Sequence, residues 1–547
     1  MPSILLSTIT RNPKDVWQAY LVLVVYIALI VAIALYTRKK AKTLDGFLLG
    51  NRSVGGWLSA FGYGTTYFSA VVFVGYAGTF GMNIGLAGVW IGIANAILGS
   101  LLAWLVLAKK TREYTNKVKA QTMPQFFEKR YSSYGLKVFS AVIIFILLIP
   151  YSTSVYQGIG YIFEAVFGLK FEYCVIIMAV VTALYVFLGG YLGNAISNFV
   201  QGIIMLGGIV LIIVLMLMSE KVNGIEGLNI LTDKGFGFFP KPDSSKYFFD
   251  RPAVMLITNI LLTSFGVWAV PQSVQKFYAI KDDKAIMRGT IISTLFALIV
   301  GGSAYFNGGF ARLFYPEMPA EGPAQVIPNM FMSNEYMGFA VLGLICVLVL
   351  AASMSTLSSL ALVSASSVGV DMYKGVIKKD ASDKSVRNLV SILSVVFVML
   401  SAVLAILRVE AIVTLMSLSW GTISGCFIGP YIYGLYTKKA SKVGAYISMI
   451  TTLVITIVLI FVFGAIGGGQ KFSELISLGV KRAPVIGVIC MILSMLVTPI
   501  GFFFQDKDIE EVKTIPYDET FRESIDEMES LSNNNDKGTE MSAKKEV

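Results

Sequence analysis

Thirteen runs of mainly apolar residues constrain this chain more than any other feature of its sequence. A bilayer core of about 30 Å needs roughly 20 residues of apolar helix to cross it. The runs lie at residues 16–36, 56–80, 82–108, 138–166, 173–190, 195–218, 253–275, 289–311, 336–370, 388–407, 411–435, 443–467 and 484–504. We therefore expect an all-α integral membrane protein with about 13 transmembrane helices.

The composition excludes several classes of protein. Only 14% of the residues are charged, against roughly 25% in soluble domains. The chain has no histidine, which removes imidazole catalysis and histidine-bound metals. Its cysteines stand singly, without metal-binding spacing, at Cys174, Cys346, Cys426 and Cys490. No nucleophile, base and orienting group can be assembled, so we expect neither an enzyme nor an organic cofactor.

The loop charges predict the orientation. Loops 37–55, 109–137, 276–288, 371–387 and 436–442 together carry 25 Lys and Arg, and the alternate loops with the N-terminus carry 13. The positive-inside rule then places the N-terminus outside a cell (plasma) membrane and the C-terminus in the cytoplasm. Because the positive charge lies in short loops, we expect no nucleic-acid partner, and no obligate protein partner is evident.

The chain divides into two parts by composition. Residues 1–505 contain all the apolar runs and are expected to form one transmembrane transporter domain. Residues 506–547 hold 13 acidic and 6 basic residues with few apolar ones. Such a segment cannot bury a core, so we predict an acidic, disordered cytoplasmic tail.

Two runs are poor continuous helices. The second has Gly62, Gly64 and several hydroxyl residues at its middle, and the seventh contains Gly266 and Pro271. Interrupted segments at matching positions of two halves indicate an inverted-repeat transporter with discontinuous helices. The repeats would cover about residues 56–218 and 253–435. The alternative is that Gly and Pro only kink ordinary membrane helices.

The ninth run places Ala352, Ser355 and Thr356 on one helical face, at i, i+3 and i+4. Two hydroxyls, joined by carbonyls freed in an unwound span, could ligate a small hard cation such as sodium. The alternative is that both hydroxyls bond the preceding helical turn, as they commonly do in membrane helices.

Five stretches in order resemble the sodium:solute symporter family. They are FLLGNRSVGGW (47–57), TMPQFFEKRY (122–131), FLGGYLGNAISNFVQ (187–201), FGVWAVPQSVQKFYAIKD (265–282) and AASMSTLSS (351–359). The resemblance covers about residues 20–505 and implies a LeuT-type five-plus-five fold. It also implies a sodium site made by the carbonyls of Thr65, Phe68 and Ala352 and the hydroxyls of Ser355 and Thr356, with Na⁺ as coupling ion.

One position departs from the family pattern. Many members have an Asp, on the inner sodium path or in an additional sodium site, where this chain has Asn198. Ser358 and Ser359, which resemble the other ligands of the additional site, are present. Without the carboxylate a second cation loses its main counter-charge, so we expect one sodium per cycle.

The solute is less constrained. Uncharged candidates near the expected midplane are Tyr67, Gln157, Thr263, Trp268, Gln272 and Trp420. The absence of an intramembrane Arg favours a small neutral or zwitterionic solute, or a monocarboxylate. Thr263 and Val267 stand where proline symporters have an aromatic pair, and the elements at 265–271 and 281–289 look more like pantothenate-type and monocarboxylate-type members.

The expected function is therefore sodium-coupled symport by alternating access. It would import a small organic solute, either a monocarboxylate, a pantothenate-like compound or an amino acid. The alternatives are a sodium-independent facilitator, a membrane sensor and a proton-coupled carrier. The last lacks a clear titratable group in mid-span.

Overall fold

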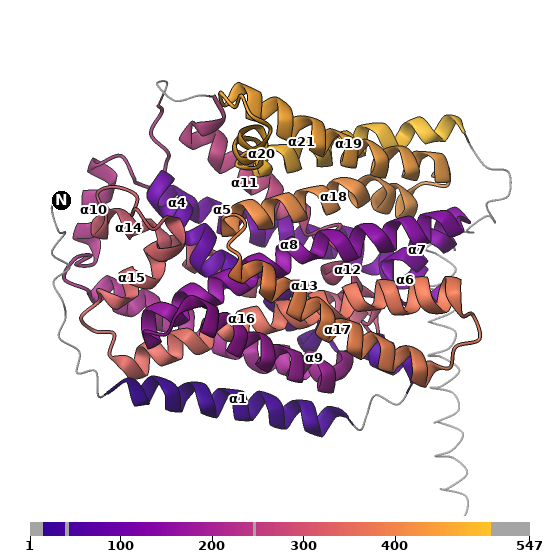
Figure 1. The fold of residues 1–547 in the computed structure, drawn as a ribbon, viewed down its shortest axis with the longest axis horizontal. Helices are drawn as coiled ribbons and strands as arrows, with labels where there is room; N and C mark the ends of the chain where they lie inside the picture. The colour runs from indigo at the N-terminus through magenta and orange to yellow at the C-terminus, as the bar shows by residue number, and fades with distance from the viewer. Residues whose placement is uncertain (1–14, 39–42, 244–247, 505–547) are drawn as a thin grey trace, which may run out of the picture. The chain divides into compact units, whose positions relative to one another are not determined.

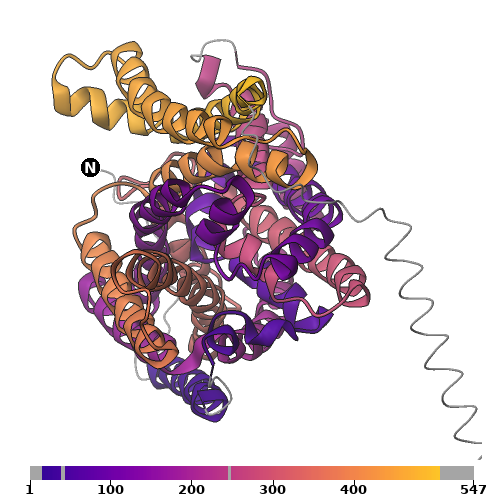
Figure 2. The same ribbon diagram turned by 90° about the vertical axis from the view of Figure 1, so that its right-hand side faces the viewer.

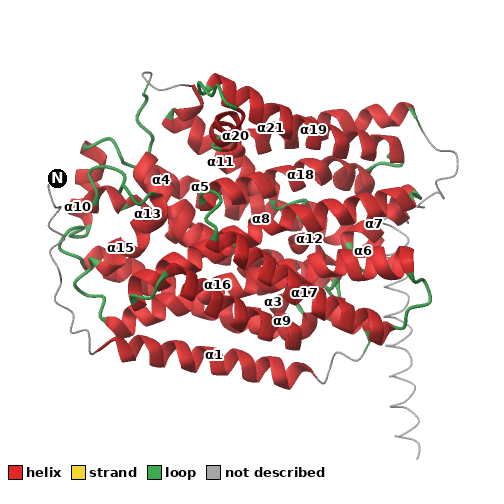
Figure 3. Cartoon of the chain, in the orientation of Figure 1, coloured by secondary structure: helices red, strands yellow, loops and turns green. Residues whose placement is uncertain are grey.

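The computed structural model describes residues 15–38, 43–243 and 248–504. The secondary-structure elements in these residues are helices joined by loops, and the only β pairing among them is an isolated bridge between Val54 and Ile280 (Figure 3). The expected all-α membrane fold is confirmed. The predicted tail at 506–547 lies outside the described residues.

Eleven helical segments in the described ranges are long and apolar enough to cross a membrane. The count is lower than thirteen for two reasons. Val71–Lys117 forms one helical stretch that joins the outer part of the second predicted span to the third. The apolar segment Phe171–Phe187 is only 17 residues long, and it forms one 48-residue helix, α9 (Phe171–Met218), with the sixth span.

The remaining long helices follow the predicted spans closely. They are α1 (Val16–Arg38), α8 (Tyr134–Phe167), α13 (Asp283–Gly309), α16 (Phe339–Ser366), α17 (Asp383–Ile406), α18 (Ile412–Tyr436), α19 (Lys442–Ile466) and α21 (Ala483–Val497). α16 lies at the centre and is almost entirely buried, whereas α1 and α19 lie at opposite edges (Figures 1 and 2). The centre of the fold is therefore the ninth predicted span.

One end of the bundle carries the basic loops and is called the basic end below. It holds α2 (Leu44–Leu49), α6 (Lys109–Lys117), α7 (Met123–Tyr131) and the α12–α13 connection, at the right of Figure 1. Six helices that start here have a side-chain N-cap, from Thr43, Thr122, Ser133, Asp282, Ser382 and Ser441. Each cap oxygen accepts a backbone N–H that the first helical turn leaves unpaired. The opposite end carries α10 (Ile225–Asp233), α14 (Ala311–Phe314) and α15 (Val326–Met332).

Many of the 51 glycines of the chain let helices approach closely. A Cβ added to Gly81 would lie 1.8 Å from the carbonyl oxygen of Gly308. A Cβ on Gly421 would lie 2.5 Å from the Cα of Gly487. These contacts join α4 (Ala77–Ile84) to α13 and α18 to α21.

Both predicted helix breaks are present. α3 (Gly56–Tyr67) stops at Phe68, which is extended with φ −109° and ψ 120°, and a wide helical turn resumes at η3 (Val71–Tyr76). α11 (Pro252–Gly266) is separated from α12 (Pro271–Tyr278) by a non-helical turn that ends at Val270. The discontinuous LeuT-type arrangement expected from the sequence is confirmed.

Candidate ion and solute sites

The break at Phe68 removes the usual partners of several carbonyl groups. The N–H of Ala70 would bond the carbonyl of Thr66 in a continuous helix, but it donates to the hydroxyl of Ser353 at 3.1 Å. The N–H of Val72 likewise bonds Ser69 instead of Phe68. The break therefore leaves carbonyl oxygens in the protein interior without their helical donors.

Two hydroxyls of α16 face these carbonyls. Ser355 Oγ lies 2.9 Å from the carbonyl oxygen of Thr65 and 2.8 Å from that of Ala352. Thr356 Oγ1 lies 3.3 Å from the carbonyl oxygen of Thr65, 3.2 Å from that of Thr66 and 3.1 Å from that of Ala352. All of these residues are buried.

This cluster holds more acceptors than it has protons. Three carbonyl oxygens and two hydroxyl oxygens converge, yet each hydroxyl can donate a single proton. An uncharged group of oxygens with spare lone pairs is the donor set that a hard cation prefers. Among the described residues no hydrogen bond joins either hydroxyl to Phe68. The Thr66 carbonyl, which we did not predict from the sequence, takes part instead.

A buried lysine lies beside this oxygen cluster, on the side toward the basic end. The ammonium of Lys276 donates to Ser359 Oγ at 3.0 Å. Ser359 Oγ is in turn 3.2 Å from Thr66 Oγ1 and donates to the carbonyl of Ser355 at 3.0 Å. The predicted loop boundary at residue 276 is wrong, because α12 continues to Tyr278 and Lys276, which lies within this helix, is buried.

Polar and aromatic side chains join the two breaks. The hydroxyl of Tyr67, the last residue of α3, donates to the carbonyl of Thr263 in α11 at 2.8 Å. Thr263 Oγ1 lies 2.7 Å from Asn95 Oδ1, which also accepts from Ser264 at 3.0 Å. Tyr67 and Trp420 have ring centroids 5.9 Å apart. The structure thus brings Tyr67, Thr263 and Trp420 together. Asn95 was missed, although an amide inside an apolar run is itself a signal.

The indole nitrogen of Trp420 is a free donor at this place. It is buried without a hydrogen-bond partner in the described part of the chain. A Cβ on Gly266, the last residue of α11, would lie 2.3 Å from it, so the indole lies directly against the second break. Tyr151 packs on the other side of the indole, with ring centroids 5.4 Å apart.

The other three predicted solute residues make no hydrogen bond to the cluster around Tyr67 in the described ranges. Gln157 donates to the carbonyl of Glu410, just before α18, at 3.1 Å. Trp268 donates to the carbonyl of Leu98 at 2.9 Å. Gln272 is buried in the first turn of α12, and its Oε1 atom has no partner among the described residues. The structure does not join these three to the cluster around Tyr67.

A cavity of about 310 Å³ opens on the side away from the basic end. It lies between α11, α18, α21 and the end of α4, and Asn259 and Thr414 are among its lining residues. Thr263 Oγ1 also bonds the carbonyl of Asn259 at 2.7 Å, so the cluster around Tyr67 lies one helical turn from this lining residue of the cavity. The ion pair of Asp250 and Arg482 contributes to its wall. Its hydrogen bonds raise the pKa of Arg482.

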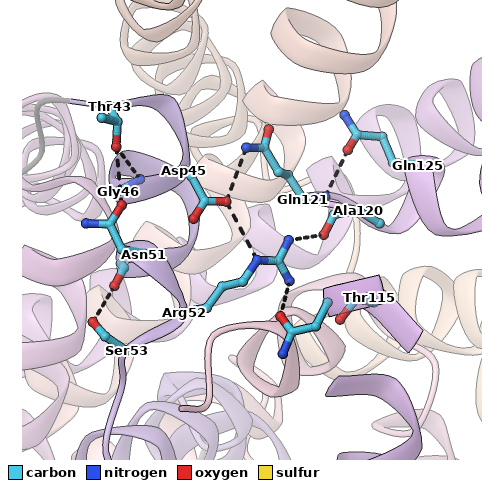
Figure 4. A network of polar contacts seen from close by, with 12 residues as sticks. Thr43, Asp45, Gly46, Asn51, Arg52, Ser53, Thr115, Ala120, Gln121 and Gln125 are labelled. Atoms are coloured by element: carbon cyan, nitrogen blue, oxygen red, sulfur yellow. Dashed lines mark hydrogen bonds and ion pairs between the residues drawn. The ribbon is translucent and has the colours of Figure 1, made fainter. Parts of the chain in front are cut away.

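At the basic end, arginines bond backbone carbonyls of neighbouring elements. Arg52 Nη2 donates to Ala120 at 2.7 Å and its Nη1 to the side chain of Asn116 at 3.0 Å. Figure 4 shows this guanidinium between Asp45 and Ala120, with Gln121 bonded to the same Asp45 carboxylate at 3.2 Å. The side chain of Arg52 therefore joins α2, α6 and the connection between α6 and α7.

Two further arginines repeat this pattern. Arg112 donates to the carbonyls of Ile280 and Lys281 at 3.0 and 2.6 Å. Arg130 donates to those of Gly434 and Thr437, each at 2.6 Å. These hydrogen bonds tie the elements at the basic end to one another, whereas the cavity lies on the opposite side.

Comparison with known proteins agrees with this architecture. A family model described as the sodium:solute symporter family matches residues 47–452. Sodium/proline symporter 2 of Staphylococcus saprophyticus is 28% identical over 464 residues, which cover 83% of this chain and 88% of that protein. The sodium/proline symporter of Staphylococcus aureus strain JH9 is 29% identical over 458 residues, covering 81% and 86%.

Solved structures show the same fold. A substrate-bound outward-open sodium-coupled sialic acid symporter superposes with a TM-score of 0.69 at 20% identity, covering 88% of this chain and 98% of that one. Mhp1, a nucleobase-cation-symport-1 family transporter with bromovinylhydantoin bound, has a TM-score of 0.50 at 14% identity, covering 85% and 96%.

Proposed function

This chain belongs to the sodium:solute symporter family, and we propose that it imports a small amino acid together with sodium. It is a multi-pass membrane transporter that works by alternating access. The basic end faces the cytoplasm in this proposal, as the loop charges predict. The cavity then faces outside, so the described arrangement is open toward the outer side.

The sodium ion binds in the oxygen cluster between α3 and α16. Its ligands are the carbonyls of Thr65 and Ala352 and the hydroxyls of Ser355 and Thr356, and the Phe68 carbonyl joins them when the break adjusts around the ion. What supports this is the excess of buried lone pairs over protons in the cluster. When sodium binds, the O–H bonds of Ser355 and Thr356 point away from the ion, and the lone pairs of the two hydroxyl oxygens point toward it.

The solute binds between the two breaks, above the sodium ion. The observation that carries this assignment is the buried indole N–H of Trp420, which has no partner and lies against Gly266. Such a donor suits one oxygen of a carboxylate, because leaving it unpaired costs roughly 1–3 kcal/mol. The freed carbonyls of the break accept hydrogen bonds only, which suits an ammonium group. A zwitterionic amino acid therefore uses both kinds of group.

Sodium supplies the driving force. Each sodium ion that enters moves one positive charge through the membrane potential, worth about 2.3 kcal/mol per 100 mV. Because both ligands contact the break of α3, the binding of each raises the affinity for the other by the same factor. The relatives named sodium/proline symporters make proline the first amino acid to test.

Three related compounds test the assignment in proteoliposomes with an inward sodium gradient. Proline carries both charged groups, cyclopentanecarboxylate lacks the amine, and pyrrolidine lacks the carboxylate. We expect an amino acid to be accumulated and the two analogues to compete weakly. If cyclopentanecarboxylate is accumulated as well as proline, the solute is a monocarboxylate. Equal uptake of every compound with potassium in place of sodium would refute symport.

A substitution isolates the indole donor. Trp420→Phe keeps an aromatic ring and removes the N–H, so the KM for the amino acid should rise about 5- to 100-fold. The matched control is Trp104→Phe, because Trp104 is also buried with an unpartnered indole but packs against Phe277, away from the cluster. An unchanged KM in Trp420→Phe would remove this residue from the site.

A further inference from the structure

Lys276 is a buried cation without a carboxylate partner. Its side chain is almost entirely covered, and its ammonium makes one hydrogen bond, to Ser359, in the part of the chain that the structure describes. The nitrogen also lies 5.4 Å from the ring centroid of Tyr191, a distance at which the face of an aromatic ring attracts a cation. No ion pair joins Lys276 to an acidic residue within the same ranges. A buried charge left in this state calls for a functional reason.

The hydroxyl of Ser359, which accepts the hydrogen bond from Lys276, lies next to the proposed sodium site. Ser359 Oγ donates its proton to the carbonyl of Ser355, and Thr66 Oγ1 donates its own to the carbonyl of Gly62 at 2.6 Å. With both protons committed, these two oxygens present lone pairs. In Ser359 a lone pair accepts from the ammonium. The fixed ammonium thus uses the acceptor that a second mobile cation would need.

A neutral amide faces the same place from α9. A Cβ on Gly62 would lie 3.8 Å from Lys276 Cδ and 3.9 Å from Asn198 Nδ2, so both side chains flank this glycine. Neither polar atom of Asn198 has a hydrogen-bond partner in the described ranges, and neither has the hydroxyl of Ser197. The compartment therefore has polar groups for an ion but no negative charge to attract one.

We propose that Lys276 is a built-in cation that takes the place of a second sodium ion on the side of the ion path toward the basic end. It thereby limits the symporter to one sodium per cycle. The inference rests on the sodium site of the proposed function. It adds that the ammonium of Lys276 and the neutral amide of Asn198 together set the stoichiometry.

The experiment counts sodium ions. Binding of ²²Na⁺ to the purified full chain gives the number of sites, and the ratio of charge to solute flux in proteoliposomes gives the number transported. We expect one sodium by both measurements for the wild type. The double variant Lys276→Met with Asn198→Asp removes the fixed charge and supplies a carboxylate, and it should bind two. Two sodium ions on the wild type would overturn the proposal.

Single variants keep the test decisive if the double variant folds poorly. Lys276→Met removes the repulsion between two cations and should lower the sodium concentration for half-saturation, whereas Lys276→Arg keeps the charge and should retain the wild-type value. The matched control is Lys137→Met, because Lys137 is also buried but is paired with Glu128 at 2.9 Å. An unchanged sodium dependence in Lys276→Met, with an unchanged melting temperature, would overturn the proposal.

A misplaced sodium site would give a different experimental result from a wrong role for Lys276. Ser355→Ala removes a ligand of that site and leaves Lys276 in place. If Ser355→Ala leaves ²²Na⁺ binding intact, the ion site of the proposed function is misplaced. If Ser355→Ala abolishes binding and the double variant still binds one ion, the site is right and the role of Lys276 is wrong.

Discussion

The sharpest test of the ion cluster is the removal of its two hydroxyls one at a time. Ser355→Ala deletes an oxygen that lies 2.9 Å from the Thr65 carbonyl, and Thr356→Val deletes an oxygen at 3.3 Å while keeping the shape of the side chain. Both changes leave the carbonyl ligands in place. A contact between a hydroxyl and a charged group contributes roughly 1.5–3 kcal/mol. Because 1.4 kcal/mol is a factor of ten, the sodium concentration for half-maximal uptake should rise about 10- to 150-fold in each variant.

The assay is the sodium dependence of uptake in proteoliposomes at saturating solute, with ²²Na⁺ binding as a second measurement. The matched control is Ser364→Ala, which removes a buried hydroxyl from the same helix, one that has no partner among the described residues. We expect the control to keep the wild-type half-saturation. A shift below twofold in both Ser355→Ala and Thr356→Val would refute the reasoning. Equal shifts in all three variants would show a general loss of packing.

Two further outcomes are expected. Tyr67→Phe removes the hydrogen bond between the two helix breaks, which contributes about 0.5–1.5 kcal/mol. It should therefore weaken the stimulation of solute binding by sodium, measured as the solute Kd with and without sodium. An unchanged ratio of these two Kd values would contradict this. Gly81→Ala forces a Cβ against the Gly308 carbonyl and should lower the melting temperature in detergent, while Gly207→Ala, which meets nothing within 4 Å, should hold or raise it. The opposite order would show that α4 and α13 can move apart.

Both helix breaks could be expected from local sequence, but the position of only one of them could. The ring of Pro271 disfavours a helical conformation in the preceding residue, and α12 begins at this proline. In the second span the glycines at 62 and 64 suggested the weak point, yet both are helical and the break falls at Phe68. Tertiary contacts decide this position, because the hydroxyl of Ser353 takes the N–H of Ala70.

The ion cluster was more accessible to sequence reasoning than the solute cluster. Ser355 and Thr356 share a helical face by spacing alone, whereas the Thr66 carbonyl leaves no trace in side-chain identity. The roles of both hydroxyls remain predictions. Gln157 and Trp268 were selected for polarity, but their bonds to backbone carbonyls depend on neighbours far along the chain. Lys276 was assigned to a loop because hydropathy cannot distinguish a buried charge from an exposed one.

The arginines at the basic end have a consequence for how this chain can vary. Arg112 and Arg130 bond four carbonyls of the main chain, at positions 280, 281, 434 and 437. Every amino acid offers the same carbonyl, so Lys281 and Thr437, whose side chains are not buried, should tolerate most substitutions. Ile280 and Gly434 are buried, and packing restricts the side chains that they can carry. The arginines should not tolerate substitution, because a lysine cannot span two acceptors with a planar fork. In a deep mutational scan scored by growth on the solute, substitutions of Arg112 and Arg130 should be harmful, whereas substitutions at the carbonyl positions whose side chains are not buried should be tolerated. No covariation is expected between the arginines and these positions.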